Sequence, residues 1–135
     1  MPEENGLEAT TAKLQILELF ARYSQYVADH RYEDWASLFG DDGQMIGTDG
    51  VRGTGAAEMK RFIEAMHDGW ILKQISSNHL IEIVGDRANS TSDYVVFRMV
   101  DGAWTIYAIG RYIDELRKGS SGWRIYRRQA IPSVR

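Results

Sequence analysis

The hydrophobic pattern of this chain changes its period near residue 75, and that change limits the possible folds more than any other feature. Before residue 75, apolar residues recur with a helical spacing. In residues 13–30, one stripe holds Leu14, Leu17, Phe20 or Ala21, Ser24, Val27 and Ala28. From Ile75 onward, apolar and polar residues alternate as they do in half-buried strands. Helices followed by a series of strands are typical of the α+β class.

The first half of the chain is divided into short elements by clusters of glycine and aspartate at residues 40–43 and by Gly-Thr-Gly at residues 53–55. We expect helices at residues 13–30, 32–39 and 56–67, and a short strand at residues 44–47. Residues 1–12 are polar and are expected to be a disordered lead-in. One domain should then cover residues 13–135.

Four long strands are expected in the second half, joined by tight turns. Gly85-Asp86 and Asp101-Gly102 are hairpin turn signals. Gly110 lies inside the third of these strands, where a glycine indicates a bend. The expected strands begin at Ile75 and cover residues 88–99, 103–117 and 123–131. They should form a curved antiparallel sheet that wraps around the helices as a cone.

Composition excludes several classes of protein. The 135 residues contain no cysteine, which excludes disulfides, thiolate nucleophiles and Cys-ligated zinc. The formal net charge is −3, and a mild acidic excess argues against a nucleic-acid-binding protein. No apolar run approaches the roughly 18–20 residues that span a bilayer, so no membrane partner is expected. The first residues lack the basic start and apolar stretch of a secretory signal, and we expect a cytoplasmic protein.

Short motifs along the chain resemble the SnoaL-like, or nuclear transport factor two-like, superfamily. They are Arg22-Tyr23, the segment 35–39 followed by 41–43, Gly53-Thr54-Gly55, Asn78-His79, the segments 85–88 and 110–114, and the segment 122–125 with Arg127-Arg128. The resemblance implies a cystatin-like α+β barrel around one pocket. Its members include polyketide cyclases, dehydratases and isomerases, and also non-enzymatic binding or assembly subunits. Because one fold serves many functions, the resemblance alone does not define an activity.

The first candidate catalytic residue is His79. Strand alternation puts it on the same face as Ile75, Ser77, Ile81 and Ile83, which should point into the cone. A histidine in an apolar pocket can act as a general base near neutral pH, or it can be a hydrogen-bonded core residue. The resemblance implies a histidine here that pairs with an aspartate on the first helix and removes a proton.

Asp29 is the candidate partner of His79, and Tyr23 is the candidate oxygen ligand. The resemblance implies an aspartate at the position of Ala28, one residue earlier, and one residue rotates a helical side chain by about 100°. Asp29 therefore faces either the pocket or the solvent. The Tyr23 hydroxyl could bind a substrate oxygen, or Tyr23 could be a core residue with its hydroxyl at the rim.

The expected pocket suits a small, ring-containing and mostly apolar ligand. No metal or cofactor is expected, because His30 and His67 are distant in sequence from His79 and no phosphate-binding glycine loop is present. Arg124, Arg127 and Arg128 are expected to be outer-face charges paired across strands. The predicted pocket residues are Val27, Trp35, Phe39, Ser77, Ile81, Trp104 and Tyr112.

Two functions fit these features. The first is a cofactor-independent lyase or isomerase of the dehydratase type, in which His79, Asp29 and Tyr23 carry the chemistry. The alternative is a non-catalytic protein that binds a small ligand or assembles as a dimer. In either case we expect a homodimer, because the strand at residues 103–117 carries apolar side chains on both of its faces and one face needs cover.

Overall fold

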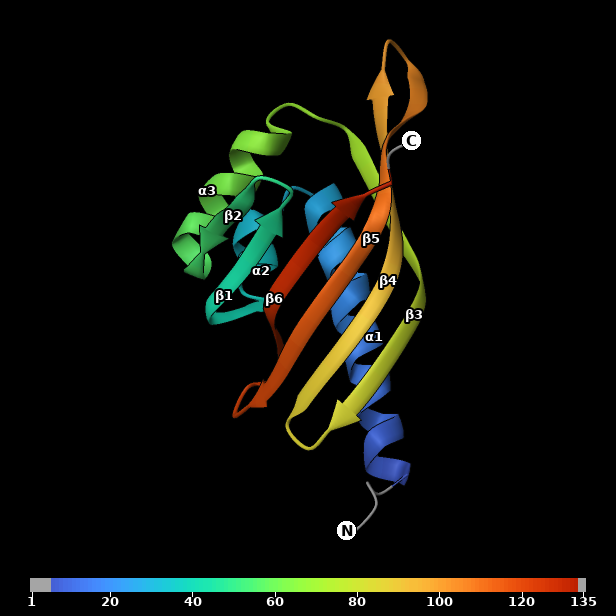
Figure 1. Ribbon diagram of the computed structural model, residues 1–135. Helices are drawn as coiled ribbons and strands as arrows, with labels where there is room; N and C mark the ends of the chain where they lie inside the picture. The colour runs from blue at the N-terminus through green and yellow to red at the C-terminus, as the bar shows by residue number, and fades with distance from the viewer. Residues whose placement is uncertain (1–5, 134–135) are drawn as a thin grey trace.

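A computed structural model describes residues 6–133 of the chain. The three helices are α1 (Gly6–Ala28), α2 (Tyr32–Ala36) and α3 (Gly55–His67). The six strands are β1 (Phe39–Gly47), β2 (Gly50–Thr54), β3 (Leu72–Val84), β4 (Arg87–Val100), β5 (Ala103–Gly119) and β6 (Gly122–Pro132). Figure 1 shows these elements in chain order.

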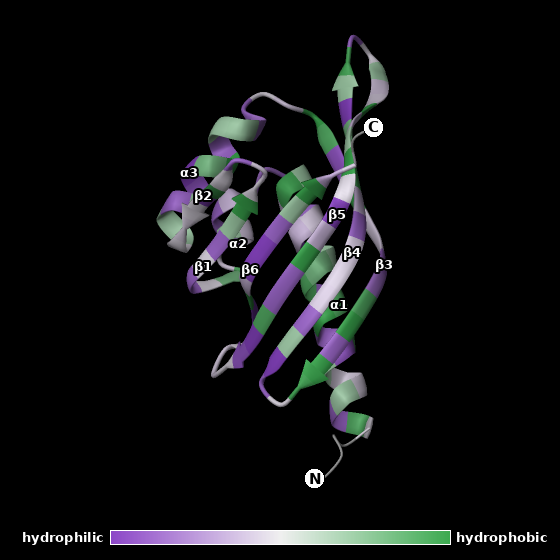
Figure 2. Cartoon of the chain, viewed as in Figure 1, coloured by the Kyte–Doolittle hydropathy of each residue, from purple (hydrophilic) through white to green (hydrophobic). Residues whose placement is uncertain are grey.

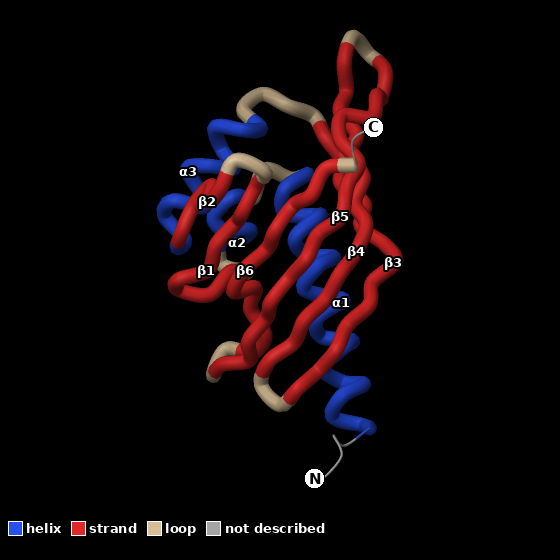
Figure 3. Tube along the Cα trace, in the orientation of Figure 1, coloured by secondary structure: helices blue, strands red, loops and turns tan. Residues whose placement is uncertain are grey.

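The six strands form one curved sheet in the order β2-β1-β6-β5-β4-β3, which does not close into a complete barrel. Neighbouring strands are antiparallel except β1 and β6, which are parallel. Helix α1 runs along one face of the sheet, while α2 and α3 lie beside β1 and β2 (Figures 1 and 3). The structure confirms the predicted α+β class and the curved sheet.

The N-terminal helix is longer than its sequence pattern predicted. It begins at Gly6 instead of residue 13, so residues 6–12, expected to be disordered, are helical. Residues 1–5 lie outside the described part. The predicted stripe is only partly confirmed, because Phe20 and Val27 are buried while Leu14 is 61% exposed and Leu17 is 38% exposed. The buried residues of α1 recur every three or four positions from Ala12 onward, as on one face of a helix. They are Ala12, Ile16, Leu19, Phe20, Tyr23 and Val27.

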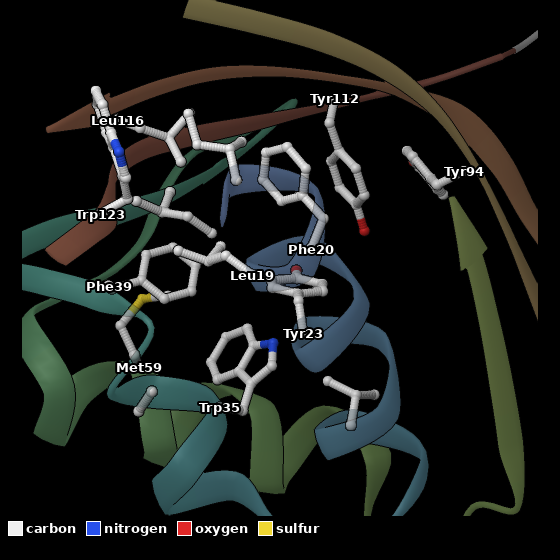
Figure 4. Packing of buried hydrophobic residues seen from close by; sticks show 14 of the residues in the cluster. Leu19, Phe20, Tyr23, Trp35, Phe39, Met59, Tyr94, Tyr112, Leu116 and Trp123 are labelled. Carbon is white, nitrogen blue, oxygen red and sulfur yellow. The ribbon is translucent and has the colours of Figure 1, made fainter. Parts of the chain in front are cut away.

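The core is an aromatic and aliphatic cluster between α1, α2 and the inner face of the sheet. Trp35 packs between Tyr23 and Phe39, with ring centroids 5.5 Å and 5.1 Å apart (Figure 4). The helix α2 ends at Ala36, and Phe39, expected at the end of that helix, starts β1 instead. Hydrophobic and hydrophilic bands alternate along β5 in Figure 2, as a strand with one buried face requires.

A bulge in β3 changes which residues face the helices. The pairing with β4 shifts between Ser77 and Leu80, where Asn78 has a positive φ of 57°. Before the bulge the inward residue is Gln74, and Ile75 is 56% exposed on the opposite face. The expectation that Ile75 and Ser77 share the face of His79 is therefore wrong.

A second bulge lies in β5. Val96 pairs with Ala108 and Phe97 pairs with Ile106, which leaves Tyr107 as the extra residue. The alternation changes at this point, so Trp104, 49% exposed, lies on the outer face with Ile106.

Among residues 6–133, no helix has both the length and the apolar character needed to cross a bilayer.

Candidate functional site

A cavity of about 440 Å³ lies between the helices and the inner face of the sheet. Its walls come from α1, α3 and all six strands. Apolar side chains such as Val27, Ile63 and Val96 form much of the lining. The polar lining residues include Tyr23, Thr48, Arg52, His67, Gln74, Tyr94, Tyr107 and Tyr112. A mostly apolar cavity with a few polar groups is the usual form of a small-molecule site.

The polar ends of three side chains meet at one wall of this cavity and are hydrogen-bonded to one another. The Gln74 amide donates a hydrogen bond to the Tyr112 hydroxyl. The Tyr112 hydroxyl is also hydrogen-bonded to Tyr23, whose ring meets it edge-on at 6.0 Å. We call Tyr23, Gln74 and Tyr112 the oxygen site. Burial raises the pKa of Tyr112 well above its usual value, so this hydroxyl keeps its proton at neutral pH.

Tyr94 braces the oxygen site from β4. Its ring stacks on Tyr112 with the centroids 4.3 Å apart (Figure 4). Gly110, on the neighbouring strand, leaves the space that this ring needs. A Cβ atom at Gly110 would lie 2.5 Å from the Tyr94 hydroxyl oxygen and equally close to the backbone oxygen of Ile131. The glycine that indicated a bend in the sequence therefore also makes room for a cavity residue.

A buried ion pair lies behind the oxygen site. The Arg128 guanidinium donates two hydrogen bonds to the Asp114 carboxylate, with Nε–Oδ1 at 2.7 Å and Nη2–Oδ2 at 2.9 Å. The two residues face each other on β6 and β5. Burial opposes the charge on Arg128, but Asp114 offsets this effect and raises the Arg128 pKa. The expectation that Arg128 is an outer-face charge is wrong.

His67, at the end of α3, is the histidine that lines the cavity. The side chain is 7% exposed, and its Nδ1 atom is buried without a hydrogen-bond partner. Burial lowers the pKa of His67 to about 4, and the nearby His30 acts in the same direction. The imidazole is therefore neutral at pH 7 and free to accept a proton.

The predicted pair of His79 and Asp29 does not form. His79 stacks on Phe20 of α1, with ring centroids 5.4 Å apart, and it does not line the cavity. Asp29 is exposed just after the end of α1, nine residues beyond Phe20, which corresponds to about 13 Å along a helix. Burial and Arg128 lower the pKa of His79, while Asp114 raises it. The carboxylate that acts on His79 is thus Asp114, and this carboxylate is already paired with Arg128.

The other predicted pocket residues divide into three groups. Tyr23, Val27 and Tyr112 line the cavity. Trp35 and Phe39 belong to the core behind Tyr23 and are not among the lining residues. The remaining three lie elsewhere: Ser77 and Trp104 are exposed outside the cone, and Ile81 lines a separate surface hollow together with His79.

Sequence reasoning missed four residues of the site, and a local signal could have found one of them, His67. His67 continues the buried i, i+4 series of Met59 and Ile63 on α3. Gln74 precedes the expected start of its strand, and β3 in fact begins at Leu72. Tyr94 and Tyr107 had no local signal, because their roles depend on a glycine in the next strand and on a bulge.

The fold and the cavity define the chain as a cystatin-like α+β protein with an internal pocket. A match to the SnoaL-like domain covers residues 8–129. The chain belongs to this family. None of the known proteins with a curated description matches the sequence significantly.

Solved structures of similar proteins share this fold. A protein of unknown function from Mycobacterium tuberculosis is 25% identical over 97% of this chain and 78% of that chain, with a TM-score of 0.90. A cystatin-like protein of unknown function from Nostoc punctiforme is 25% identical over 98% and 96%, with a TM-score of 0.82. A Novosphingobium aromaticivorans protein named as a scytalone dehydratase is 21% identical over 93% and 89%, with a TM-score of 0.79. This last likeness shows the fold alone.

Proposed function

We propose that the chain binds a small, ring-containing and mostly apolar ligand in the cavity and moves a proton on it, as a lyase or isomerase without a cofactor. One observation carries the proposal: the oxygen site and the neutral His67 imidazole line the same cavity. Dehydration and isomerisation next to a carbonyl both require a donor to the oxygen and an acceptor for the proton on carbon.

The oxygen site supplies the donor. Gln74 donates to the Tyr112 hydroxyl, and Tyr112 can donate to Tyr23 in turn. The Tyr23 proton is then directed to a ligand oxygen. Hydrogen bonds of this kind strengthen as charge develops on that oxygen, because the lining of the cavity is mostly apolar.

His67 is the proposed proton acceptor in place of His79. A pKa of about 4 makes it a weak base in the empty cavity. The enolate that forms when a proton leaves carbon is negative, and a nearby negative charge favours the imidazolium. The transition state would therefore bring the His67 pKa closer to neutral.

The alternative function is ligand binding without catalysis. Within residues 6–133, no Asp or Glu is among the residues that line the cavity, so the described lining holds no carboxylate base. If His67 is too weak a base, the same cavity would hold a ligand without reaction.

Deuterium exchange on 2-tetralone separates these possibilities. This cyclic ketone has acidic C–H bonds beside its carbonyl, and NMR in D₂O follows their exchange. The parent protein should accelerate exchange. Tyr23→Phe and His67→Asn should each reduce the acceleration by about 10²-fold or more. His79→Asn is the control and should exchange like the parent.

Two other outcomes of the tetralone experiment would decide against the proposed role of His67 or against catalysis. A loss in His79→Asn with full activity in His67→Asn would assign the base to His79 and overturn the role of His67. Binding of 2-tetralone with no exchange above buffer would favour the ligand-binding alternative.

We also propose that two copies of the chain pair through the outer face of the sheet. The pairing of the strands places Ile75, Val95 and Ile109 in one row across β3, β4 and β5, and Phe97 beside Ile106 in the next. Ile75, Ile106 and Ile109 are 56%, 60% and 45% exposed. A continuous apolar patch of this kind supports a protein contact.

A further inference from the structure

The buried pair of Arg128 and Asp114 takes no part in the proton transfer proposed above, and its surroundings suggest a separate role. The side chains of Arg128 and Asp114 are 1% and 0% exposed. Ser90 adds a hydrogen bond to Asp114 at 3.3 Å, and all three residues lie in one row across β4, β5 and β6. The pair is thus held rigidly by the sheet.

The positive end of this pair faces the oxygen site. The central carbon of the Arg128 guanidinium lies 3.7 Å from the ring centroid of Tyr112 and 4.4 Å from that of Tyr23. Phe20 covers it from α1 at 4.8 Å. A cation over a phenol ring draws electron density from it and makes its hydroxyl a better donor. Consistent with this, Arg128 acts to lower the pKa of Tyr112 against the dominant effect of burial.

A buried ion pair is a poor source of folding stability. Removing two charges from water costs several kcal/mol, and apolar residues of similar volume often stabilise a core as well or better. The pair therefore calls for an explanation other than stability. Its contacts with both phenols of the oxygen site provide one.

We infer that Arg128, fixed by Asp114, is a positioning residue that makes the oxygen site prefer an ionised ligand oxygen. The ligand class is then a ring compound with an acidic hydroxyl group, a phenol or an enol, which binds as its anion. The part of the cavity lining that the structure describes contains no carboxylate, and His67 is neutral, so no negative group in this described lining repels such an anion. This inference rests on the proposed binding of a ring-containing ligand in the cavity.

The test measures the pKa of 4-nitrophenol bound to the protein, because its phenolate absorbs visible light and the phenol does not. In the parent protein, the phenolate should bind at least about tenfold more tightly than the phenol, which lowers the bound pKa by about one unit. Tyr112→Phe should remove most of this shift. Asp114→Asn should lower the bound pKa further, because the Arg128 charge is then less compensated.

A double variant guards against loss of folding. Arg128→Met combined with Asp114→Leu replaces both charges with apolar groups, which a core tolerates far better than a single unpaired charge. Circular dichroism should show that the double variant is folded. The absorbance titration should show that it still binds neutral 4-nitrophenol and has lost the preference for the phenolate.

The outcomes separate this inference from the proposed function. If the double variant keeps the full pKa shift, or the parent binds phenol and phenolate equally, the role of Arg128 is wrong while the cavity remains a ligand site. If the parent binds neither form, the proposed ligand site itself fails, and this inference fails with it.

Discussion

At the scale of single residues, the site depends on side chains whose usual place is the surface. Arg128 is charged and fully buried, and the sequence pattern suggested an exposed strand residue. Its burial is possible because Asp114 lies directly opposite it on the neighbouring strand. Asp114 alternates with Tyr112, so its inward direction could have been predicted. Its pairing with Arg128 could not, because the register that the turn between β5 and β6 sets shifts between Leu116 and Glu115, before the strands reach Asp114.

The buried His67 should make the stability of the protein depend on pH. Its pKa in the folded state, about 4, is below the ordinary value of 6.5. As the pH falls through 6.5, the unfolded chain binds a proton that the folded chain does not, so stability decreases until about pH 4 and then levels off. The expected loss between pH 7 and pH 5 is about 2 kcal/mol.

Urea unfolding at pH 7 and pH 5 measures this loss. Between pH 7 and pH 5, the free energy of unfolding of His67→Gln should fall by about 2 kcal/mol less than that of the parent. An equal decrease in the parent and in His67→Gln would mean that other groups cause the pH dependence.

At the scale of elements, the sequence located the four long strands well and their faces poorly, while it missed β2 and the first half of β1. Turn signals such as Gly85-Asp86 and Asp101-Gly102 are local, and the hairpins form where they were expected. The direction of a side chain depends on an unbroken alternation, and one extra residue reverses it. The bulges at Asn78 and Tyr107 therefore moved Ser77 and Trp104 to the outer face, and nothing local in the sequence indicated them.

Gly110 should be essential to the packing of β5 against β4. In Gly110→Ala the new Cβ would meet both Tyr94 and the backbone of Ile131 at 2.5 Å, and the backbone contact cannot be relieved by a side-chain rotation. We expect a loss of about 1–3 kcal/mol in the free energy of unfolding.

The matched control for Gly110→Ala is Gly119→Ala in the same strand, where no atom of the described residues beyond its two chain neighbours lies within 4 Å of the added Cβ. Urea denaturation of both variants provides the measurement. If both variants unfold at the same urea concentration, the predicted close packing at Gly110 is wrong.

At the scale of the whole molecule, the curved sheet has an inner face that encloses the cavity and an outer face with an apolar patch. Helical and strand periods in the sequence predicted this two-layer arrangement, since all three helices lie in the first half of the chain and the second half holds the four long strands. The cavity could not be predicted in detail, because every strand and two helices contribute to its walls.

The proposed pairing of two copies predicts a mass twice 15.4 kDa at micromolar concentration. Ile109→Lys places a charge in the centre of the outer patch and should give a monomer, because burying an unpaired charge in an interface is costly. The control is Leu14→Lys, at an exposed position on α1. Light scattering of all three proteins tests the proposal, and a 15.4 kDa parent would contradict it.

The most direct test of the account is whether Tyr23 binds the oxygen of a ligand in the cavity. Isothermal titration with 2-naphthol would compare the parent, Tyr23→Phe and Tyr26→Phe. Tyr26 lies one turn further along α1 and is not among the cavity-lining residues. Loss of one buried hydrogen bond should weaken binding about tenfold in Tyr23→Phe. Tyr26→Phe should bind like the parent. Equal affinity in all three proteins would contradict the assignment of the oxygen site.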